Sequence, residues 1–303
     1  MPQRTNKEIF LSLGLVLIPV TVLLITVVVV NVLNKKPAVA VVQEEIVAQI
    51  PEQPILQNVN IKARAAYVKN LNTGKVLYAK NENEKLPLAS LTKIMTALVA
   101  KKNADGNQLI KISDSDLATE GEYYLSSQEI FKLKDLIDIT MAGSVNDTAT
   151  AISGVLNNEK TFIDEMNSTA KQIGLTNSTF QNPTGLDTNV FTASAKGSAK
   201  DITTLLQYTI INYPDIFEAT TVNNVTIQST DGITHKIKNT NEITGELPGL
   251  IASKTGFTDL AGGNLALIVD MGLNEPVAIV ILGSPNSETR FDDALEIIQN
   301  IKK

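Results

Sequence analysis

The stretch GLIASKTGFTDLAGGNLALIVDMGLNEPVAIVILG, from Gly249 to Gly283, decides the fold. It contains three short apolar runs separated by glycine and asparagine residues, which favour turns. Runs of this length are typical of buried strands. The spacing therefore predicts an antiparallel meander, and the segment SETRFDDALEIIQNIKK (287–303) follows it as a predicted amphipathic helix.

The other end of the folded region also carries strand signals. The segment ARAAYVKNLNTGKVLYAKN (63–81) predicts two strands around a turn at residues 72–74. Between hairpin and meander, helical spacing of apolar residues predicts helices within residues 87–100, 126–144, 161–174 and 198–214. We therefore expect an α+β fold, in which one antiparallel sheet is assembled from both ends of the domain and carries a helical insertion.

The N-terminal region contains IFLSLGLVLIPVTVLLITVVVV, from Ile9 to Val30, which has no charged residue and is long enough to cross a bilayer. We expect residues 9–33 to be a transmembrane anchor, although a cleaved signal is an alternative. Residues 1–8 precede it, a proline-containing linker occupies residues 34–60, and the folded domain covers residues 61–303. Lysine and arginine are balanced around the span, so charge leaves its orientation open.

Composition excludes several classes of function. The 303 residues carry a formal net charge of -6 without a basic run, which argues against a nucleic-acid partner. The chain has no cysteine, so neither a disulfide framework nor a thiolate nucleophile is available. Its single histidine, His235, lies in a polar alternating stretch and is interpreted as a half-exposed strand residue.

Two segments place a serine three residues before a lysine, a spacing that puts both on one helix face. In STAK, Ser168 to Lys171, the apolar face of the helix lies opposite Ser168, so we interpret this pair as surface residues. In PLASLTKIMTALVA, residues 87–100, apolar side chains surround Ser90 and Lys93 almost completely. The helix within residues 87–100 is therefore predicted to lie in the centre of the domain. Burying the charged amine of Lys93 there is costly, which points to a functional role for this lysine.

Two later motifs complete a set. SVN occupies residues 144–146 after a predicted helix, and KTG occupies residues 254–256 on a predicted strand. Ser-x-x-Lys, Ser-x-Asn and Lys-Thr-Gly in this order are the motifs of penicillin-binding proteins and serine β-lactamases. With the runs MNSTAKQIGLTNSTFQNPTGLD (166–187) and KTGFTDLAGGNLAL (254–267), residues 63–303 resemble a low-molecular-mass penicillin-binding protein, a serine D-alanyl-D-alanine carboxypeptidase.

The resemblance implies a DD-peptidase domain over residues 61–303 and a role for each motif residue. Ser90 would be the nucleophile, Lys93 the general base, Ser144 a proton relay and Asn146 a ligand of the substrate carbonyl. The backbone amides of Ser90 and Phe257 would form the oxyanion hole. Lys254, Thr255, Gly256 and Arg290 would bind the substrate at its terminal carboxylate, although Arg290 could instead be a surface residue at a helix N-terminus.

The proposed base requires a large change in pKa. No histidine or cysteine is placed to deprotonate Ser90, so Lys93 must act as a neutral amine. That means lowering its pKa from about 10.4 to about 7, which corresponds to about 4 to 5 kcal/mol. We expect burial and repulsion from Lys254 to act in this direction.

Two positions depart from the family pattern: Val145 replaces a usual glycine, and Phe257 stands where a histidine is common. A class A β-lactamase is an alternative, but the Glu-x-x-Leu-Asn string that supplies its deacylating base is absent. D,D-endopeptidase action on cross-links uses the same residues and stays open. A non-catalytic wall-binding protein is disfavoured because all three motifs are intact.

The resemblance also implies partners and location. The expected substrate is the peptidoglycan stem pentapeptide, and β-lactams are expected as covalent inhibitors, with neither metal nor organic cofactor. Because this substrate lies outside the cytoplasmic membrane, residues 1–8 should be cytoplasmic and the catalytic domain extracytoplasmic.

Overall fold

The computed structural model describes residues 55–56, 59–117 and 125–302. The predicted anchor at residues 9–33 and most of the predicted linker lie outside this part. The strands are β1 (Ala65–Asn70), β2 (Val76–Lys80), β3 (Leu86–Pro87), β4 (Leu109–Lys111), β5 (Ile130–Lys132), β6 (Thr179–Phe180), β7 (Ala195–Gly197), β8 (Asn224–Gln228), β9 (Thr234–Lys238), β10 (Leu250–Thr258), β11 (Gly262–Asp270) and β12 (Pro276–Ser284). The helices are η1 (Ala89–Leu91), α2 (Thr92–Asn103), α3 (Leu133–Ala142), α4 (Asn146–Ser153), η2 (Gly154–Leu156), α5 (Glu159–Gln172), α6 (Ala199–Asn212), η3 (Pro214–Thr221), η4 (Thr244–Glu246) and α7 (Thr289–Ile301).

The main sheet has five antiparallel strands in the order β10-β11-β12-β1-β2. The predicted meander forms β10 to β12, and the predicted hairpin forms β1 and β2. The two ends of the domain meet where β1 pairs with β12, with Ala65 opposite Leu282 and Asn70 opposite Val277. The prediction of one antiparallel sheet assembled from both ends is therefore confirmed, and β10 is left at its edge.

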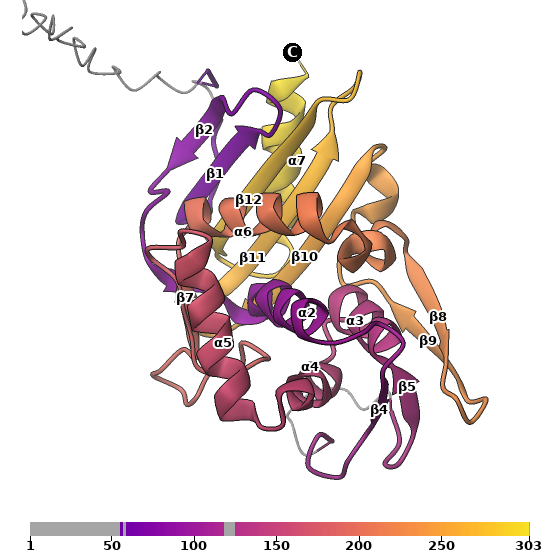
Figure 1. Ribbon diagram of the computed structural model, residues 1–303. Helices are drawn as coiled ribbons and strands as arrows, with labels where there is room; N and C mark the ends of the chain where they lie inside the picture. Colours follow the sequence, from indigo (N-terminus) through magenta and orange to yellow (C-terminus); the bar gives the residue numbers. More distant parts are fainter. Residues whose placement is uncertain (1–54, 57–58, 118–124, 303) are drawn as a thin grey trace, which may run out of the picture. The chain divides into compact units, whose positions relative to one another are not determined.

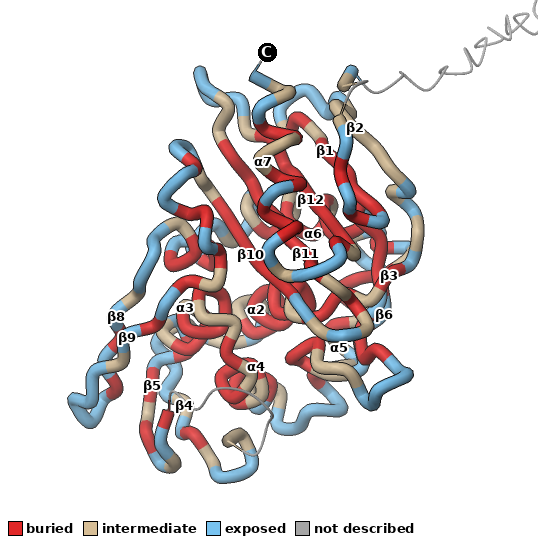
Figure 2. The backbone as a smooth tube through the Cα atoms, turned by 180° about the vertical axis from the view of Figure 1, so that it is seen from behind, coloured by how far each residue is buried: buried red, intermediate tan, exposed pale blue. Residues whose placement is uncertain are grey.

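Alternating side chains of the central strands fill two separate cores. On β11, Leu265, Leu267 and Val269 pack with apolar residues of α7. The intervening residues Ala266 and Ile268 join the larger core, which contains α2 and α6. Figures 1 and 2, seen from opposite sides, show α6 and α7 on opposite faces of the sheet. Burial on both faces explains why these strands are continuously apolar rather than alternating in polarity.

Helix α2 lies in the centre of the molecule, as its composition predicts. Every residue from Thr92 to Ala100 is buried, including one lysine, and Figure 2 shows the tube at α2 in red. The helix is surrounded by α3, α4, α5 and α6, so almost no direction around its axis is open to solvent. The burial of the helix on all its faces from Thr92 to Ala100, rather than of one face, places the Ser-x-x-Lys segment in a low-dielectric interior.

One helix prediction is wrong at its start. The helix predicted within residues 126–144 counts Ile130 among the apolar residues at helical spacing, but residues 130–132 form β5 and α3 begins at Leu133. Strand β5 pairs with β4, with Leu109 opposite Lys132. Pairing with β4 therefore outweighs the helical spacing of residues 130–132, because a local sequence pattern contains no information about a distant pairing partner.

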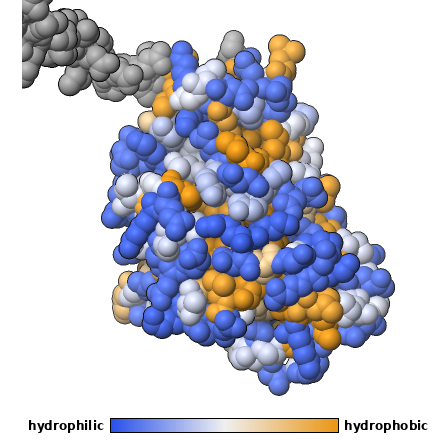
Figure 3. Space-filling view, viewed as in Figure 1, coloured by the Kyte–Doolittle hydropathy of each residue, from blue (hydrophilic) through white to orange (hydrophobic). Residues whose placement is uncertain are grey.

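The face of the molecule seen in Figure 3 is mostly hydrophilic, with apolar side chains in small groups among polar ones. In the part of the chain that the structure describes, no helix combines the length and apolar character needed to cross a bilayer. The described domain thus places its apolar residues mainly in the two cores around the sheet.

Candidate active site

Ser90 and Lys93 are in direct contact at the start of the central helix. Ser90 lies in η1, and Lys93 is the second residue of α2. The Lys93 Nζ donates hydrogen bonds to Ser90 Oγ at 2.8 Å, to Asn146 Oδ1 at 2.7 Å and to the Thr184 carbonyl at 2.8 Å. Ser90 is half-buried, so its hydroxyl sits between the buried lysine and solvent. This arrangement suits a serine whose proton is taken by an amine.

The three acceptors satisfy the amine without supplying a negative charge. Lys93 is fully buried, and this burial lowers its pKa to about 7. The sequence prediction also attributed part of the shift to repulsion from Lys254. At Lys254 the pKa is lowered well below its usual range by burial first and then by repulsion from Lys93 and Arg290.

Ser144 and Asn146 approach the pair from the loop between α3 and α4. Asn146 is the first residue of α4, and its side-chain oxygen accepts the bond from Lys93. The Lys254 Nζ donates to Ser144 Oγ at 2.9 Å and to the Thr255 carbonyl at 2.9 Å. Four separated parts of the sequence, at residues 90–93, 144–146, 184 and 254–255, therefore meet through two lysine side chains.

The backbone at two of these positions is left-handed without glycine. Ala89, immediately before Ser90, has a φ of 47°, and Ser144 has a φ of 59°. This conformation costs an alanine or serine about 1 kcal/mol or more and persists only where its surroundings impose it. In both cases it occurs at or next to a hydroxyl of the site, which suggests that the surrounding structure fixes the direction of both hydroxyls.

Strand β10 runs against the turn that carries Ser90. A Cβ added to Gly256 would lie 3.1 Å from the Ser90 nitrogen and 3.0 Å from the Leu88 carbonyl oxygen, so only glycine allows this approach without displacement. Asn264 on β11 holds the same segment, because its side-chain nitrogen donates to the carbonyls of Pro87 and Leu88 at 3.0 Å each. Phe257 follows Gly256 on the edge strand, and this residue is 48% exposed.

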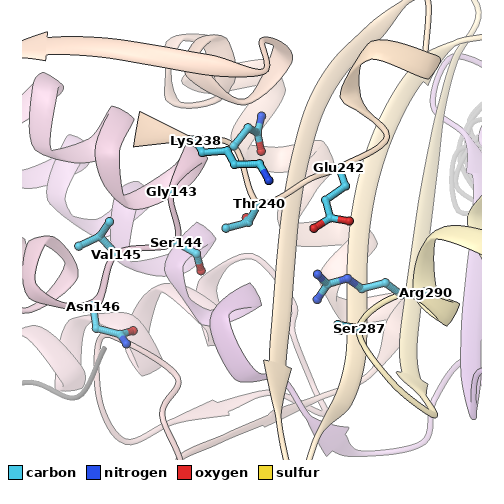
Figure 4. Close-up of a pocket in the computed structure, with 10 residues that line it drawn as sticks. Gly143, Ser144, Val145, Asn146, Lys238, Thr240, Glu242, Ser287 and Arg290 are labelled. Carbon is cyan, nitrogen blue, oxygen red and sulfur yellow. The ribbon is translucent and has the colours of Figure 1, made fainter. Parts of the chain in front are cut away.

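A cavity of about 440 Å³ opens beside Ser144 and Asn146 (Figure 4). Arg290, on the first turn of α7, lines it and is buried, so the alternative of a surface arginine is wrong. Its guanidinium donates to the Gly256 carbonyl at 2.9 Å, and burial lowers its pKa to about 10. The cavity is thus a polar hollow that presents a buried cation.

The hydroxyls of Thr255 and Thr240 lie next to each other at this part of the site. Thr255 is buried on β10, and its Oγ1 lies 2.6 Å from the Oγ1 of Thr240. Thr240 lines the cavity with Glu242, whose carboxylate points toward Arg290 in Figure 4. A carboxylate ligand in this hollow would meet hydroxyl donors and a guanidinium, which is a set suited to a peptide C-terminus.

Sequence reasoning did not identify Thr240, Glu242 or the Thr184 carbonyl as parts of the site. Thr184 lies in the quoted run 166–187, but nothing in its type indicates a carbonyl aimed at a lysine. His235 lies on a strand, β9, as predicted, but its side chain is only 10% exposed, and its Nε2 lies 2.8 Å from Oε1 of the buried Glu129, which the sequence did not indicate. That pair joins β9 to the segment before β5.

The second Ser-x-x-Lys string lies on α5, away from these groups. Ser168 is half-exposed and accepts a bond from Gln172 at 3.3 Å, and Lys171 is exposed. Among the described residues, no carboxylate hydrogen-bonds either Ser90 or Lys93. Within the described part of the chain, the Lys93 amine therefore bonds a serine hydroxyl, an amide oxygen and a backbone carbonyl, and no carboxylate.

Comparisons with known proteins agree with this arrangement. A model of the family described as D-alanyl-D-alanine carboxypeptidase matches residues 48–286. D-alanyl-D-alanine carboxypeptidase DacF of Bacillus subtilis is 30% identical over 235 residues, which are 75% of this chain and 59% of that protein. A D-alanyl-D-alanine endopeptidase of Escherichia coli is 32% identical over 246 residues, covering 77% of this chain and 75% of the relative.

Comparison with solved structures also finds a penicillin-binding protein. Penicillin-binding protein D2 of Listeria monocytogenes, in its ampicillin-bound crystal form, matches with a TM-score of 0.72 and 27% identity, over 82% of this chain and 100% of that one. The chain spans about 59% of the length of the Bacillus relative. Given the family match over most of its length, this chain belongs to the D-alanyl-D-alanine carboxypeptidase family.

Proposed function

We propose that this protein is a serine D-alanyl-D-alanine carboxypeptidase that removes the terminal D-alanine from peptidoglycan stem pentapeptides. The observation that carries the proposal is the contact between Ser90 Oγ and the fully buried Lys93 Nζ, whose pKa is lowered to about 7. An amine with this pKa is substantially neutral at neutral pH and can accept a proton.

In the first half-reaction, Ser90 Oγ bonds to the carbonyl carbon of the penultimate D-alanine while its proton passes to Lys93. The resulting oxyanion is stabilised by the backbone N–H groups of Ser90 and Phe257. The C–N bond then breaks, a proton reaches the leaving amine through Ser144, and D-alanine departs. Asn146 holds the substrate's amide carbonyl and the Lys93 amine together.

In the second half-reaction, water attacks the acyl ester on Ser90, gives its proton to Lys93, and the proton returns to Ser90 Oγ. The terminal carboxylate of the substrate is bound by Lys254, Thr255 and Arg290 before cleavage, with Gly256 providing the close backbone approach. Binding in this hollow selects for peptides with a free C-terminus.

β-Lactams acylate the same serine in this proposal. Because no carboxylate of the described residues bonds Ser90 or Lys93, the penicilloyl ester should be hydrolysed slowly. Rapid and complete hydrolysis of a penicillin by the pure protein would instead establish the β-lactamase alternative.

The direct test combines covalent labelling with product release. The protein is incubated with a fluorescent penicillin, the adduct is located by peptide mass spectrometry, and D-alanine release from a stem pentapeptide is measured. We expect the label on Ser90 and release of one D-alanine per peptide. A label on Ser168 contradicts the site, and the absence of both label and D-alanine supports a wall-binding protein.

A second candidate activity is D,D-endopeptidase action on cross-links, and one observation favours it. The cavity beside Arg290 extends to Lys238 and Glu242, and a neighbouring cavity of about 450 Å³ shares Lys238, Asn239 and Glu242 with it. Together they offer more room than a single D-alanine leaving group needs. Cleavage of a purified cross-linked muropeptide dimer to monomers, absent in Ser90→Ala, would establish this activity.

The membrane part of the proposal rests on the sequence. Residues 9–33 anchor the chain in the bacterial cytoplasmic membrane as a single span, residues 1–8 lie inside, and residues 34–60 link the span to an extracytoplasmic domain. The wall substrate lies on that side of the membrane. In fractionated cells the full chain should sediment with membranes and residues 34–303 should not. Proteinase added to spheroplasts should digest the domain, and its protection there would contradict the orientation.

A further inference from the structure

The hairpin formed by β8 and β9 lies beside β5 and α3 (Figure 1). Side chains alternate along a strand, so His235 and Ile237 point to one side of β9. On this side Ile237 is fully buried and the His235 side chain is only 10% exposed, whereas Lys236 and Lys238 are exposed. Strand β9 therefore packs the face that carries His235 and Ile237 against the helical part of the domain.

Near the tip of the hairpin, His235 forms a buried hydrogen bond. Its Nε2 lies 2.8 Å from Oε1 of Glu129, whose side chain is 3% exposed. A carboxylate can only accept, so the imidazole donates, and such charge-assisted bonds are stronger than neutral ones. The rings of His235 and Phe131 lie 5.6 Å apart. The Thr230 nitrogen also donates to the Ile130 carbonyl at 2.8 Å, so this half of the hairpin is fixed to residues 129–131.

At its other end, β9 lies against the loop between α3 and α4. A Cβ added to Gly143 would overlap Cγ2 of Ile237, so the strand packs directly on this backbone. The Thr240 nitrogen, two residues after β9, donates to the Ala142 carbonyl at 3.0 Å, and its Oγ1 lies 3.3 Å from the same oxygen. Strand β9 and the residues after it therefore hold the two residues that precede Ser144.

The position of Ser144 depends on that support. Its backbone is left-handed, with a φ of 59°, a conformation that a serine keeps only where the surrounding structure imposes it. In the proposed function, on which this inference rests, the Ser144 hydroxyl passes a proton to the leaving nitrogen. Proton transfer requires hydrogen-bond distance, and a displacement of about 1 Å can lower a rate by about a hundredfold. A relaxed loop would leave Ser90 and Lys93 in place but deprive the leaving group of its proton.

We propose that His235 and Glu129 are positioning residues for the Ser144 hydroxyl. Their hydrogen bond fixes β9, and β9 in turn holds Gly143, so that Ser144 keeps its left-handed backbone and directs its hydroxyl to the leaving nitrogen. Neither His235 nor Glu129 lines the cavity beside Arg290. The pair therefore acts through Ser144, on the step in which the C–N bond breaks and the nitrogen takes up a proton.

The test compares two substrates that give the same acyl-enzyme. One is Nα,Nε-diacetyl-L-Lys-D-Ala-D-Ala, and in the other D-thiolactate replaces the last D-alanine, so that sulfur stands in place of the leaving nitrogen. The nitrogen must take up a proton when the C–N bond breaks, whereas the sulfur leaves as a thiolate with the electron pair of the C–S bond. Because both substrates keep the terminal carboxylate, the ratio of their kcat/KM values isolates the proton transfer through Ser144.

His235→Phe keeps a ring beside Phe131 but removes the hydrogen-bond donor. We expect kcat/KM to fall about tenfold for the amide and by less than about twofold for the thioester. Glu129→Leu, which removes the acceptor, should give a similar selective loss, whereas His235→Gln, which keeps a donor, should retain most of the amide rate. Ile237→Ala uncovers Gly143 and should also lower the amide rate selectively, whereas Ile237→Val keeps a γ-methyl there and should not.

Glu165→Leu is the matched control, because it removes a carboxylate on α5 that accepts a bond from Thr169 at 3.1 Å. It should leave the ratio of amide to thioester at the wild-type value. Equal losses for both substrates in His235→Phe, or no loss, overturn the assignment. Where this variant does not fold, the same result in Ile237→Ala does so.

Ser144→Ala separates this failure from that of the proposed function, because it removes the relay itself and should lower the amide rate selectively. If it does so while the His235 and Glu129 variants do not, the positioning role alone is refuted. If Ser144→Ala lowers the rates of both substrates equally, the proton relay of the proposed function is refuted and the positioning role with it.

Discussion

The two Ser-x-x-Lys strings of this protein have the same letters and different surroundings. Ser90 and Lys93 lie at the start of a helix buried on all sides, and the lysine contacts the serine, an amide and a carbonyl. Ser168 and Lys171 lie on a helix with one buried face; Ser168 is half-buried like Ser90, but Lys171 is exposed. The comparison teaches that spacing brings the two groups to one face, while burial decides whether the amine can become a base.

The largest expected difference concerns the serines. Ser90→Ala removes the nucleophile and should lower D-alanine release by about ten thousandfold or more, with complete loss of penicillin labelling. Ser168→Ala should leave both within twofold of wild type. Release kinetics and gel fluorescence measure the effect, and equal losses in the two variants would remove the distinction between the strings.

The lysines should differ next. Lys93→Arg keeps a positive charge but cannot lose it near neutral pH, so the acylation rate should fall by about a thousandfold. Lys171→Arg should change the rate by less than twofold because this side chain is exposed. Stopped-flow acylation by a penicillin gives both numbers. Retention of more than a tenth of the rate in Lys93→Arg would be incompatible with Lys93 as the base.

Each serine–lysine string also has a glycine with a left-handed backbone nearby, and the two glycines differ in how closely they are packed. Gly185 (φ 80°) follows Thr184, the carbonyl partner of Lys93, whereas Gly174 (φ 83°) ends the segment that carries Ser168. An added Cβ meets the Ala89 carbonyl oxygen at 2.0 Å in the first case and nothing within 4 Å in the second. We expect Gly185→Ala to lower the free energy of unfolding by about 3 kcal/mol and Gly174→Ala by about 1 kcal/mol.

Urea unfolding followed by circular dichroism measures both values. Gly185→Ala should also slow penicillin acylation, because the displaced turn carries Ser90, whereas Gly174→Ala should not. Equal stabilities of the two variants would show that the turn before Ser90 can relax around a side chain.

The smallest effect expected is a dependence of the acylation rate on pH, which should come from Lys93 and not from Lys171. With the pKa of Lys93 at about 7, the neutral fraction rises about tenfold between pH 6 and pH 8, and the acylation rate should rise with it. Wild type and Lys171→Met should give the same profile. A flat profile over this range would mean that another group accepts the Ser90 proton.

The same shift affects stability in a definite direction. Between pH 7 and about 10.5 the unfolded chain holds a proton on Lys93 that the folded chain has lost, so stability rises with pH in this window and the penalty is fully present below pH 7. Lys93→Met, which removes the penalty, should therefore gain more in Tm over wild type at pH 6 than at pH 9. Lys171→Met should show no such pH dependence.

Much of the fold follows from local patterns in the sequence. Apolar runs separated by turn residues predicted β10 to β12, and the hairpin around residues 72–74 predicted β1 and β2, as found. The start of α3 could not be predicted in this way. The strand at residues 130–132 exists because it pairs with residues 109–111, and a local window contains no record of that partner.

The site likewise contains residues that the sequence predicted and residues that it did not. The three motifs located the residues that the structure brings together around Lys93 and Lys254, because their order and spacing are properties of the chain. The Thr184 carbonyl and the Thr240 hydroxyl were missed, since their roles depend on contacts with Lys93 and Thr255 that only the folded chain creates. The left-handed conformations of Ala89 and Ser144 also have no signal in residue type.

The pairing of β1 with β12 has a consequence for timing. Ser90 and Lys93 lie early in the chain, whereas β10 and the arginine of α7 come near its end, and synthesis proceeds from the N-terminus. A growing chain therefore exposes its serine–lysine segment long before the edge strand beside it exists. Until residues 250–301 have emerged and closed the sheet, the nascent chain lacks β10 and Arg290, which supply one half of the site.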